Sequence, residues 1–165
     1  MPTITYTPIA TYTAPSAQAS VTFNSFSGYT DLVLVTTHTC ATGTNNTLAL
    51  QFNGDTTNLY SRTAIYGDGS TADSFRVSNE TAIYTGFAGS NSAITQTNIS
   101  IQNYSNTTTT KTVLIRSTVP AGQTRATVSL WRKTPEAITS ILLFPASGTF
   151  ATGSTFTLYG IKAGS

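Results

Sequence analysis

Two Asp-containing turns are the first segments of this sequence whose residue types could do chemistry: Asn53-Gly54-Asp55 and the loop 67–73, GDGSTAD. Calcium binds carboxylate and carbonyl oxygens, and Asp68, Ser70 and Asp73 could supply some of them. The EF-hand pattern is absent, however, and Gly and Asp are common in tight turns because they tolerate unusual backbone angles. Asn-Gly after alternating hydrophobic residues is also a strong hairpin signal. We therefore interpret both segments first as turns, and calcium binding by the 68–73 loop stays open.

A His–Cys pair is the second candidate. His38 and Cys40 are the only histidine and cysteine, and their spacing places both side chains on one face of a strand. Nothing nearby supplies a third group to orient a thiol–imidazole pair, and no G-x-S-x-G motif is present. A zinc site needs more His and Cys ligands than these two residues provide. We expect both residues to be packed in a sheet.

The carboxylates are few and scattered, whereas a glycosidase needs two that face each other. The sequence therefore predicts no enzyme, no catalytic residue, no metal site and no cofactor. The carboxylates are Asp31, Asp55, Asp68, Asp73, Glu80 and Glu136.

Composition indicates which elements must position these residues. Charged residues make up 8% of the 165, against about 25% in ordinary soluble domains, and 35 Thr, 18 Ser and 10 Asn take their place. Hydrophobic residues at 39% are enough for a core, and the Val, Ile, Thr and aromatic content favours strands. The net charge of +2 includes no basic cluster of the kind that nucleic-acid binding requires. No apolar run approaches the ~20 residues that span a bilayer, and the N-terminus lacks the features of a signal peptide. We expect a chain that is made in a cytoplasm.

Short alternating segments separated by turns predict an all-β fold, an antiparallel β-sandwich with one domain over 21–165. The run DLVLV within 31–41 suggests a strand that is covered on both faces, and the spacing of Thr134, Pro135 and Glu136 suggests one helical turn. The predicted strands are 19–26, 31–41, 47–53, 93–104, 111–119, 125–133, 138–144 and 155–162.

Residues 1–20 differ from the rest because prolines recur at about every seventh position. Proline blocks helix and central strand, so this segment is predicted to be an extended arm. It could lie across an adjacent subunit, with Tyr6, Ile9 and Tyr12 as the subunit contacts, or close the edge of its own sheet. We favour the first alternative.

Several blocks, in order, resemble small virion proteins of tailed bacteriophages. The blocks are YTDLVLV, LALQFNGDTTNLYS with IYGDGS, ISIQNYSNTTTTKTVLI, and the closing segment 130–161, and together they cover most of residues 20–162. The residues that match the motifs of that group are Phe52, Asn53, Gly54, Asp55, Tyr60, Ser61, Tyr104, Lys111, Gly153, Ser154, Leu158, Tyr159 and Gly160. The resemblance implies a structural protein with a jelly-roll-like sandwich, in which these residues serve turns and the core.

The leading hypothesis is a capsid decoration or cement protein on the exterior of the virion. It would form a homotrimer and bridge subunits of the major capsid protein, without binding nucleic acid or a membrane. The low content of charged residues supports this hypothesis. An interface of Thr and Ser avoids ordering long charged side chains, which costs about 1.5–2 kcal/mol of rotamer entropy each. The alternative is a glycan- or receptor-binding domain of a tail or head fibre, with exposed Tyr and Trp131 stacking on sugars. A glycan hydrolase is a third and weaker hypothesis.

Overall fold

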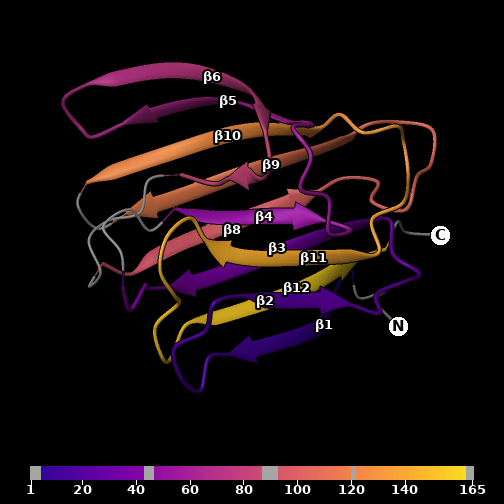
Figure 1. Cartoon of the computed structure of the whole chain (residues 1–165), viewed down its shortest axis with the longest axis horizontal. Helices are drawn as coiled ribbons and strands as arrows, with labels where there is room; N and C mark the ends of the chain where they lie inside the picture. Colours follow the sequence, from indigo (N-terminus) through magenta and orange to yellow (C-terminus); the bar gives the residue numbers. More distant parts are fainter. Residues whose placement is uncertain (1–4, 43–46, 87–92, 120–121, 163–165) are drawn as a thin grey trace.

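A computed structural model describes residues 5–42, 47–86, 93–119 and 122–162. These residues form 12 strands and no helix, which confirms the predicted all-β fold. All strand pairs are antiparallel, and the two sheets pack face to face as a β-sandwich (Figure 1). Nowhere in the described ranges is there a helix long and apolar enough to cross a membrane.

The two sheets differ in size. The large sheet has eight strands, in the spatial order β1 (Tyr6–Thr13), β12 (Thr155–Ile161), β3 (Asp31–His38), β8 (Thr95–Ile101), β9 (Lys111–Val119), β10 (Gln123–Trp131), β5 (Tyr60–Gly67) and β6 (Ala72–Glu80). The small sheet has four strands, in the order β2 (Val21–Asn24), β11 (Ser140–Pro145), β4 (Leu48–Phe52) and β7 (Ile83–Tyr84). The jelly-roll connectivity implied by the resemblance stays a prediction.

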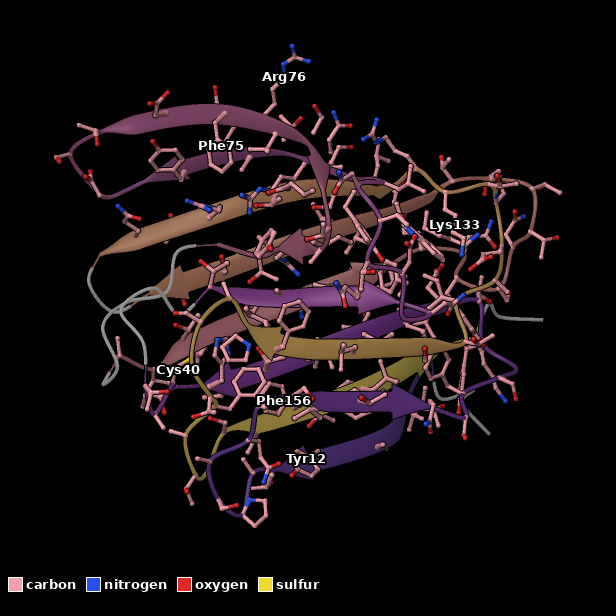
Figure 2. All side chains as sticks on the ribbon, viewed as in Figure 1. Tyr12, Cys40, Phe75, Arg76, Lys133 and Phe156 are labelled. Atoms are coloured by element: carbon pink, nitrogen blue, oxygen red, sulfur yellow. The ribbon has the colours of Figure 1, made fainter. Side chains whose placement is uncertain are left out.

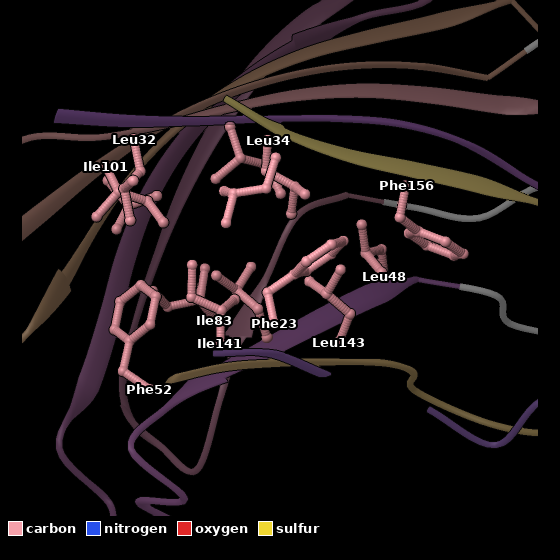
Figure 3. Close-up of a cluster of buried hydrophobic side chains, with 14 of the residues drawn as sticks. Phe23, Leu32, Leu34, Leu48, Phe52, Ile83, Ile101, Ile141, Leu143 and Phe156 are labelled. Carbon is pink, nitrogen blue, oxygen red and sulfur yellow. The ribbon is translucent and has the colours of Figure 1, made fainter. Parts of the chain in front are cut away.

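The core lies between the sheets and follows from the alternation of side chains along each strand. The large sheet turns one apolar set inward and the small sheet turns another toward it, as Figure 3 shows. The labelled side chains from the large sheet are Leu32, Leu34, Ile101 and Phe156, and those from the small sheet are Phe23, Leu48, Phe52, Ile83, Ile141 and Leu143.

The small sheet is too narrow to cover the whole large sheet. In Figure 1 its strands β2, β11 and β4 lie in front of β12, β3 and β8, and the β5–β6 hairpin extends past it. Because the small sheet does not extend over this hairpin, other side chains must pack its inward side. The opposite side of the large sheet, which we call the outer face, has no layer over it in the described part of the chain.

Each segment predicted as a strand contains one, but one detail was wrong and another was right only in part. Residues 134–137 form no helical turn: 134 and 135 are bends and 136–137 are irregular, because Asn53 from another part of the chain binds the Glu136 carboxylate and the Ala137 carbonyl. Strand β3 is covered on both faces only in its first part: Leu32 and Leu34 are buried in the core and Val33 is buried on the opposite side, but Val35 is 40% exposed on the outer face.

The N-terminal segment belongs to the sandwich. Strand β1 pairs with β12 along its whole length, with a register shift at Pro8, so the segment closes the edge of its own sheet. Ile9 and Tyr12 pack against the core of the same chain, whereas Tyr6 is 55% exposed. A contact between Tyr6 and another subunit stays a prediction, and residues 1–4 of the predicted arm lie outside the described residues.

Candidate functional site

The Asn53-Gly54-Asp55 turn links three parts of the chain. Asn53 and Gly54 have positive φ angles of 52° and 67°, which suits Asn and Gly. The Asn53 amide donates to Glu136 Oε1 (2.9 Å) and to the Ala137 carbonyl (2.8 Å). Its oxygen accepts hydrogen bonds from the Thr139 amide N–H (2.8 Å) and hydroxyl (3.1 Å), and from the Ser140 amide (3.2 Å). Asn53 therefore fixes the connection between β10 and β11.

Asp55 is buried and uses both carboxylate oxygens within the protein. Oδ2 accepts a hydrogen bond from Trp131 Nε1 (2.7 Å), and Oδ1 accepts bonds from the amide (2.9 Å) and the hydroxyl (2.5 Å) of Thr57. Burial by itself raises the pKa of Asp55, but the bonds from Thr57 and Trp131 outweigh burial and lower it below its usual value. Because both oxygens are already bonded, this carboxylate is a structural anchor for Trp131.

The predicted turn is thus confirmed, but the hairpin that Asn-Gly signals does not form. Strand β4 ends at Phe52 in the small sheet, and the next strand, β5, begins at Tyr60 in the large sheet. The Tyr60 hydroxyl spans the turn, since it accepts from the Phe52 amide (3.1 Å) and donates to the Asp55 carbonyl (3.1 Å). The turn carries the chain from one sheet to the other.

The 67–73 loop is the exposed turn between β5 and β6. Asp68 Oδ1 accepts hydrogen bonds from the backbone amides and the hydroxyls of Ser70 and Thr71, and these bonds hold the Asp68 pKa well below its usual value. Asp73 binds the Ser74 amide through Oδ1 (2.7 Å). Within the described ranges no three His, Cys, Asp or Glu side chains lie close enough to hold a metal ion. The loop geometry is that of an Asx turn.

His38 and Cys40 are both buried. The His38 ring lies parallel to Phe156 and edge-on to Phe150, and its Nδ1 is 3.4 Å from the Thr36 hydroxyl. Burial lowers the pKa of His38 to about 4 and raises that of Cys40 to about 11. A neutral imidazole and a protonated thiol are the opposite of an activated pair, so the geometry favours packing, as the sequence indicated.

Trp131 is 2% exposed, so its predicted role as an exposed sugar-stacking side chain is wrong. Its ring lies parallel to Tyr60, with centroids 6.3 Å apart, and edge-on to Phe52 at 5.6 Å. The alternation of β10 explains this, because Trp131 points inward while Leu130 points outward.

Other residues that carry the resemblance also lie at turns and in the core. The Lys111 ammonium group donates to the carbonyls of Asn106 and Thr109, and so fixes the loop before β9. The Ser154 hydroxyl donates to the Thr39 carbonyl (3.2 Å). Gly160 lies against the Tyr29 ring, where a Cβ atom would be 2.2 Å from the nearest ring carbon. None of these contacts exposes a reactive group.

An arginine–aromatic stack (Tyr84, Arg62, Phe75, Arg125 and Tyr66) packs the inward side of the β5–β6 hairpin. The Arg62 guanidinium lies 5.4 Å from the Phe75 centroid and 5.2 Å from that of Tyr84. The Arg125 guanidinium lies 5.1 Å from Phe75 and 5.3 Å from Tyr66. Phe75 is central, and Figure 2 shows it on the hairpin beyond the edge of the small sheet. Local sequence spacing does not reveal this cluster, because its members come from β5, β6, β7 and β10.

The outer face of the large sheet is a broad surface that no other layer covers in the described part of the chain. Val35, Asn98, Arg116, Ala126 and Ile65 lie opposite one another across five strands and form one row. This row lines a hollow of about 1150 Å³. The row includes one amide and one guanidinium, and most other residues that line the hollow are Thr, Ser or Gln, so its apolar residues form a strip within a polar surrounding.

A second row on the outer face brings apolar side chains directly together. Leu114 of β9 lies opposite Val128 of β10, and Leu130 follows two residues along β10. Their exposed fractions are 41%, 46% and 37%, and Ile65 in the neighbouring row is 62% exposed. Sequence alternation placed Val128 and Leu130 on the face opposite Trp131, but did not reveal which face is covered. Adjacent exposed apolar residues on several strands are typical of an interaction surface.

Comparison with known proteins gives no independent assignment. No protein-family model matches the sequence, and no match is found among curated proteins.

Proposed function

We propose that this protein is a non-enzymatic structural protein of a tailed-bacteriophage particle, a capsid decoration or cement protein. Its outer face binds subunits of the major capsid protein on the exterior of the virion. The observation that carries the proposal is the patch of exposed apolar side chains on the neighbouring strands β9, β10 and β5 of that face, formed by Leu114, Val128, Leu130 and Ile65. The resemblance of the sequence blocks to small phage virion proteins supports the same reading.

The outer face suits repeated binding on a lattice. A stable interface buries about 800 Å² on each partner, and a face of eight strands offers an extended area for this contact. Contacts of modest strength become effective when many copies, linked as trimers, bind a symmetric surface at once. The charged side chains that border the apolar patch are arginines, Arg76, Arg116 and Arg132, so a partner surface that buries them must supply acidic groups. The homotrimer is part of the proposal, with each trimer at a threefold position of the capsid.

The buried position of Trp131 weighs against the glycan-binding alternative. The three rings of the arginine–aromatic stack do lie in series, but guanidinium groups lie over them. They therefore do not form the open aromatic groove that sugar stacking requires. The proposed activity is binding between proteins, and the chain is made in the host cytoplasm before assembly.

A carboxylate within the apolar patch is expected to weaken capsid binding strongly. Val128→Asp places a carboxylate beside Leu114 at the centre of the second row, and we expect at least a tenfold loss in affinity, or about 1.4 kcal/mol. The measurement is the number of copies that bind purified capsids from phage lacking this protein. Thr22→Asp is the matched control, because Thr22 is also exposed on a strand but belongs to the small sheet.

The two variants distinguish a capsid contact on the outer face from a contact elsewhere on the protein. Wild type and Thr22→Asp should bind to the same level, while Val128→Asp should remain folded and bind much more weakly. Equal binding by all three proteins would place the contact elsewhere. A wild-type protein that is monomeric at high concentration and does not bind these capsids would contradict the proposed function itself.

A further inference from the structure

A cavity of about 460 Å³ lies beside the arginine–aromatic stack. Arg62, Arg125 and Glu80 line it together with Phe75 and Tyr84. The volume falls in the range of small-molecule sites and is large enough for a single sugar or amino acid. The cavity lies on the inward side of the large sheet, so it is separate from the proposed capsid-binding face.

The charges around the cavity favour an anion. Among the described residues that line it, two carry a guanidinium and one a carboxylate, a formal net charge of +1. Glu80 Oε1 forms an ion pair with Arg62 at 3.0 Å. Arg125 is 8% exposed, and both its burial and the nearby Arg62 charge lower its pKa. Added negative charge would therefore stabilise this arrangement, since like charges at low dielectric repel each other strongly.

The geometry of the two guanidinium groups indicates which class of anion fits the cavity. A guanidinium that stacks on rings keeps its N–H groups in its own plane, along its edge, where a planar carboxylate accepts two parallel hydrogen bonds. The Glu80 carboxylate beside Arg62 opposes a second negative charge on the ligand, so a monoanion fits the net charge better than a phosphate dianion. Guanidinium groups lie over Phe75 and Tyr84, so these partly exposed side chains contribute edge contacts to the ligand and not a stacking surface.

We propose that this cavity binds a carboxylate-bearing ligand, with Arg125 as the main contact and Arg62 as the second. The carboxylate can belong to an acidic sugar or to a peptide C-terminus, because both present the same planar group. The inference does not depend on the proposed capsid role.

The test is titration of the full chain with D-glucuronate and with N-acetyl-L-alanine, followed by NMR of the arginine Nε–H signals. D-glucose and N-acetyl-L-alanine amide are the matched neutral probes, and inorganic phosphate is the dianion. We expect at least one acid to shift the Arg125 signal with a Kd of about 1 mM. The neutral probes and phosphate should bind at least about tenfold more weakly, a difference of about 1.4 kcal/mol.

Variants then assign the contact. Arg125→Gln should weaken acid binding at least about tenfold, while Arg116→Gln, an exposed arginine on the outer face, should leave it unchanged. If only one acid binds, its class, acidic sugar or peptide C-terminus, is the ligand. If both acids bind, the cavity recognises the carboxylate group alone. Absence of any acid-specific shift in the wild type overturns the proposal, even if Arg125→Gln fails to fold. Unchanged binding in a folded Arg125→Gln protein also overturns it.

Discussion

Replacing Asp55 with alanine is expected to lower the free energy of unfolding by about 3 kcal/mol, because hydrogen bonds to charged groups contribute about 1.5–3 kcal/mol and unsatisfied buried donors are costly. The carboxylate accepts bonds from Trp131 Nε1 and from both donors of Thr57. Removing it leaves the indole N–H of a fully packed side chain without this acceptor. Urea unfolding at neutral pH measures the change.

Two further variants test the physical reason. Asp55→Asn keeps an acceptor but loses the charge, so its effect should be smaller than that of alanine. In the Asp55→Ala background, Trp131→Phe should cost less than in the wild type, because the indole N–H has already lost its acceptor. Asp68→Ala is the matched control, since Asp68 accepts a similar set of bonds in an exposed turn. If Asp55→Ala costs no more than Asp68→Ala, Asp55 is not the anchor described here.

Acid should destabilise the protein through His38. Burial lowers its pKa from 6.5 to about 4, so the unfolded chain takes up a proton at a pH where the folded protein does not. The stability contributed by neutral His38 is therefore fully present above pH 6.5 and is lost as the pH falls toward 4. Each unit between the two pKa values is worth about 1.4 kcal/mol, so the total loss is about 3 kcal/mol.

Unfolding free energies at several pH values between 7.5 and 4 check this expectation. In His38→Gln, which cannot be charged, the decline with pH should be much smaller across the same range. Other groups also titrate: the lowered pKa values of Asp55 and Asp68 make acid destabilising in the same sense as His38, whereas burial raises the pKa of Glu80 and gives the opposite pH dependence. These groups are present in both proteins and cancel in the comparison. Parallel pH profiles for the wild type and His38→Gln would show that His38 is not the group responsible.

Alternation along the chain predicted most of the fold, because burial on one face of a strand leaves a direct pattern in the sequence. Phe156 and Leu158, and also Ile99 and Ile101, point into the core as their spacing indicated. The left-handed turn at Asn53-Gly54 was readable for a similar reason, since few residues suit its backbone angles.

Local sequence patterns did not predict which segments far apart in the chain lie side by side. Asn-Gly predicted a hairpin, but the chain leaves the small sheet there and enters the large one. The bends near Glu136 replaced a helical turn because Asn53 competes for that segment. The arginine–aromatic stack likewise gathers residues from four strands that no local spacing connects. Alternation also identifies two faces of a strand without saying which one a second sheet covers, so the exposure of Val128 required the structure.

The most direct test of the proposed function is the copy number of this chain per virion. Quantitative mass spectrometry of purified particles of the phage that encodes it compares this chain with the major capsid protein. A decoration protein predicts about one copy per major capsid subunit, or one trimer at each threefold position. Only a handful to a few dozen copies per particle would contradict the capsid role and place the protein in the tail or fibres. Its absence from the purified particle would contradict a virion role altogether.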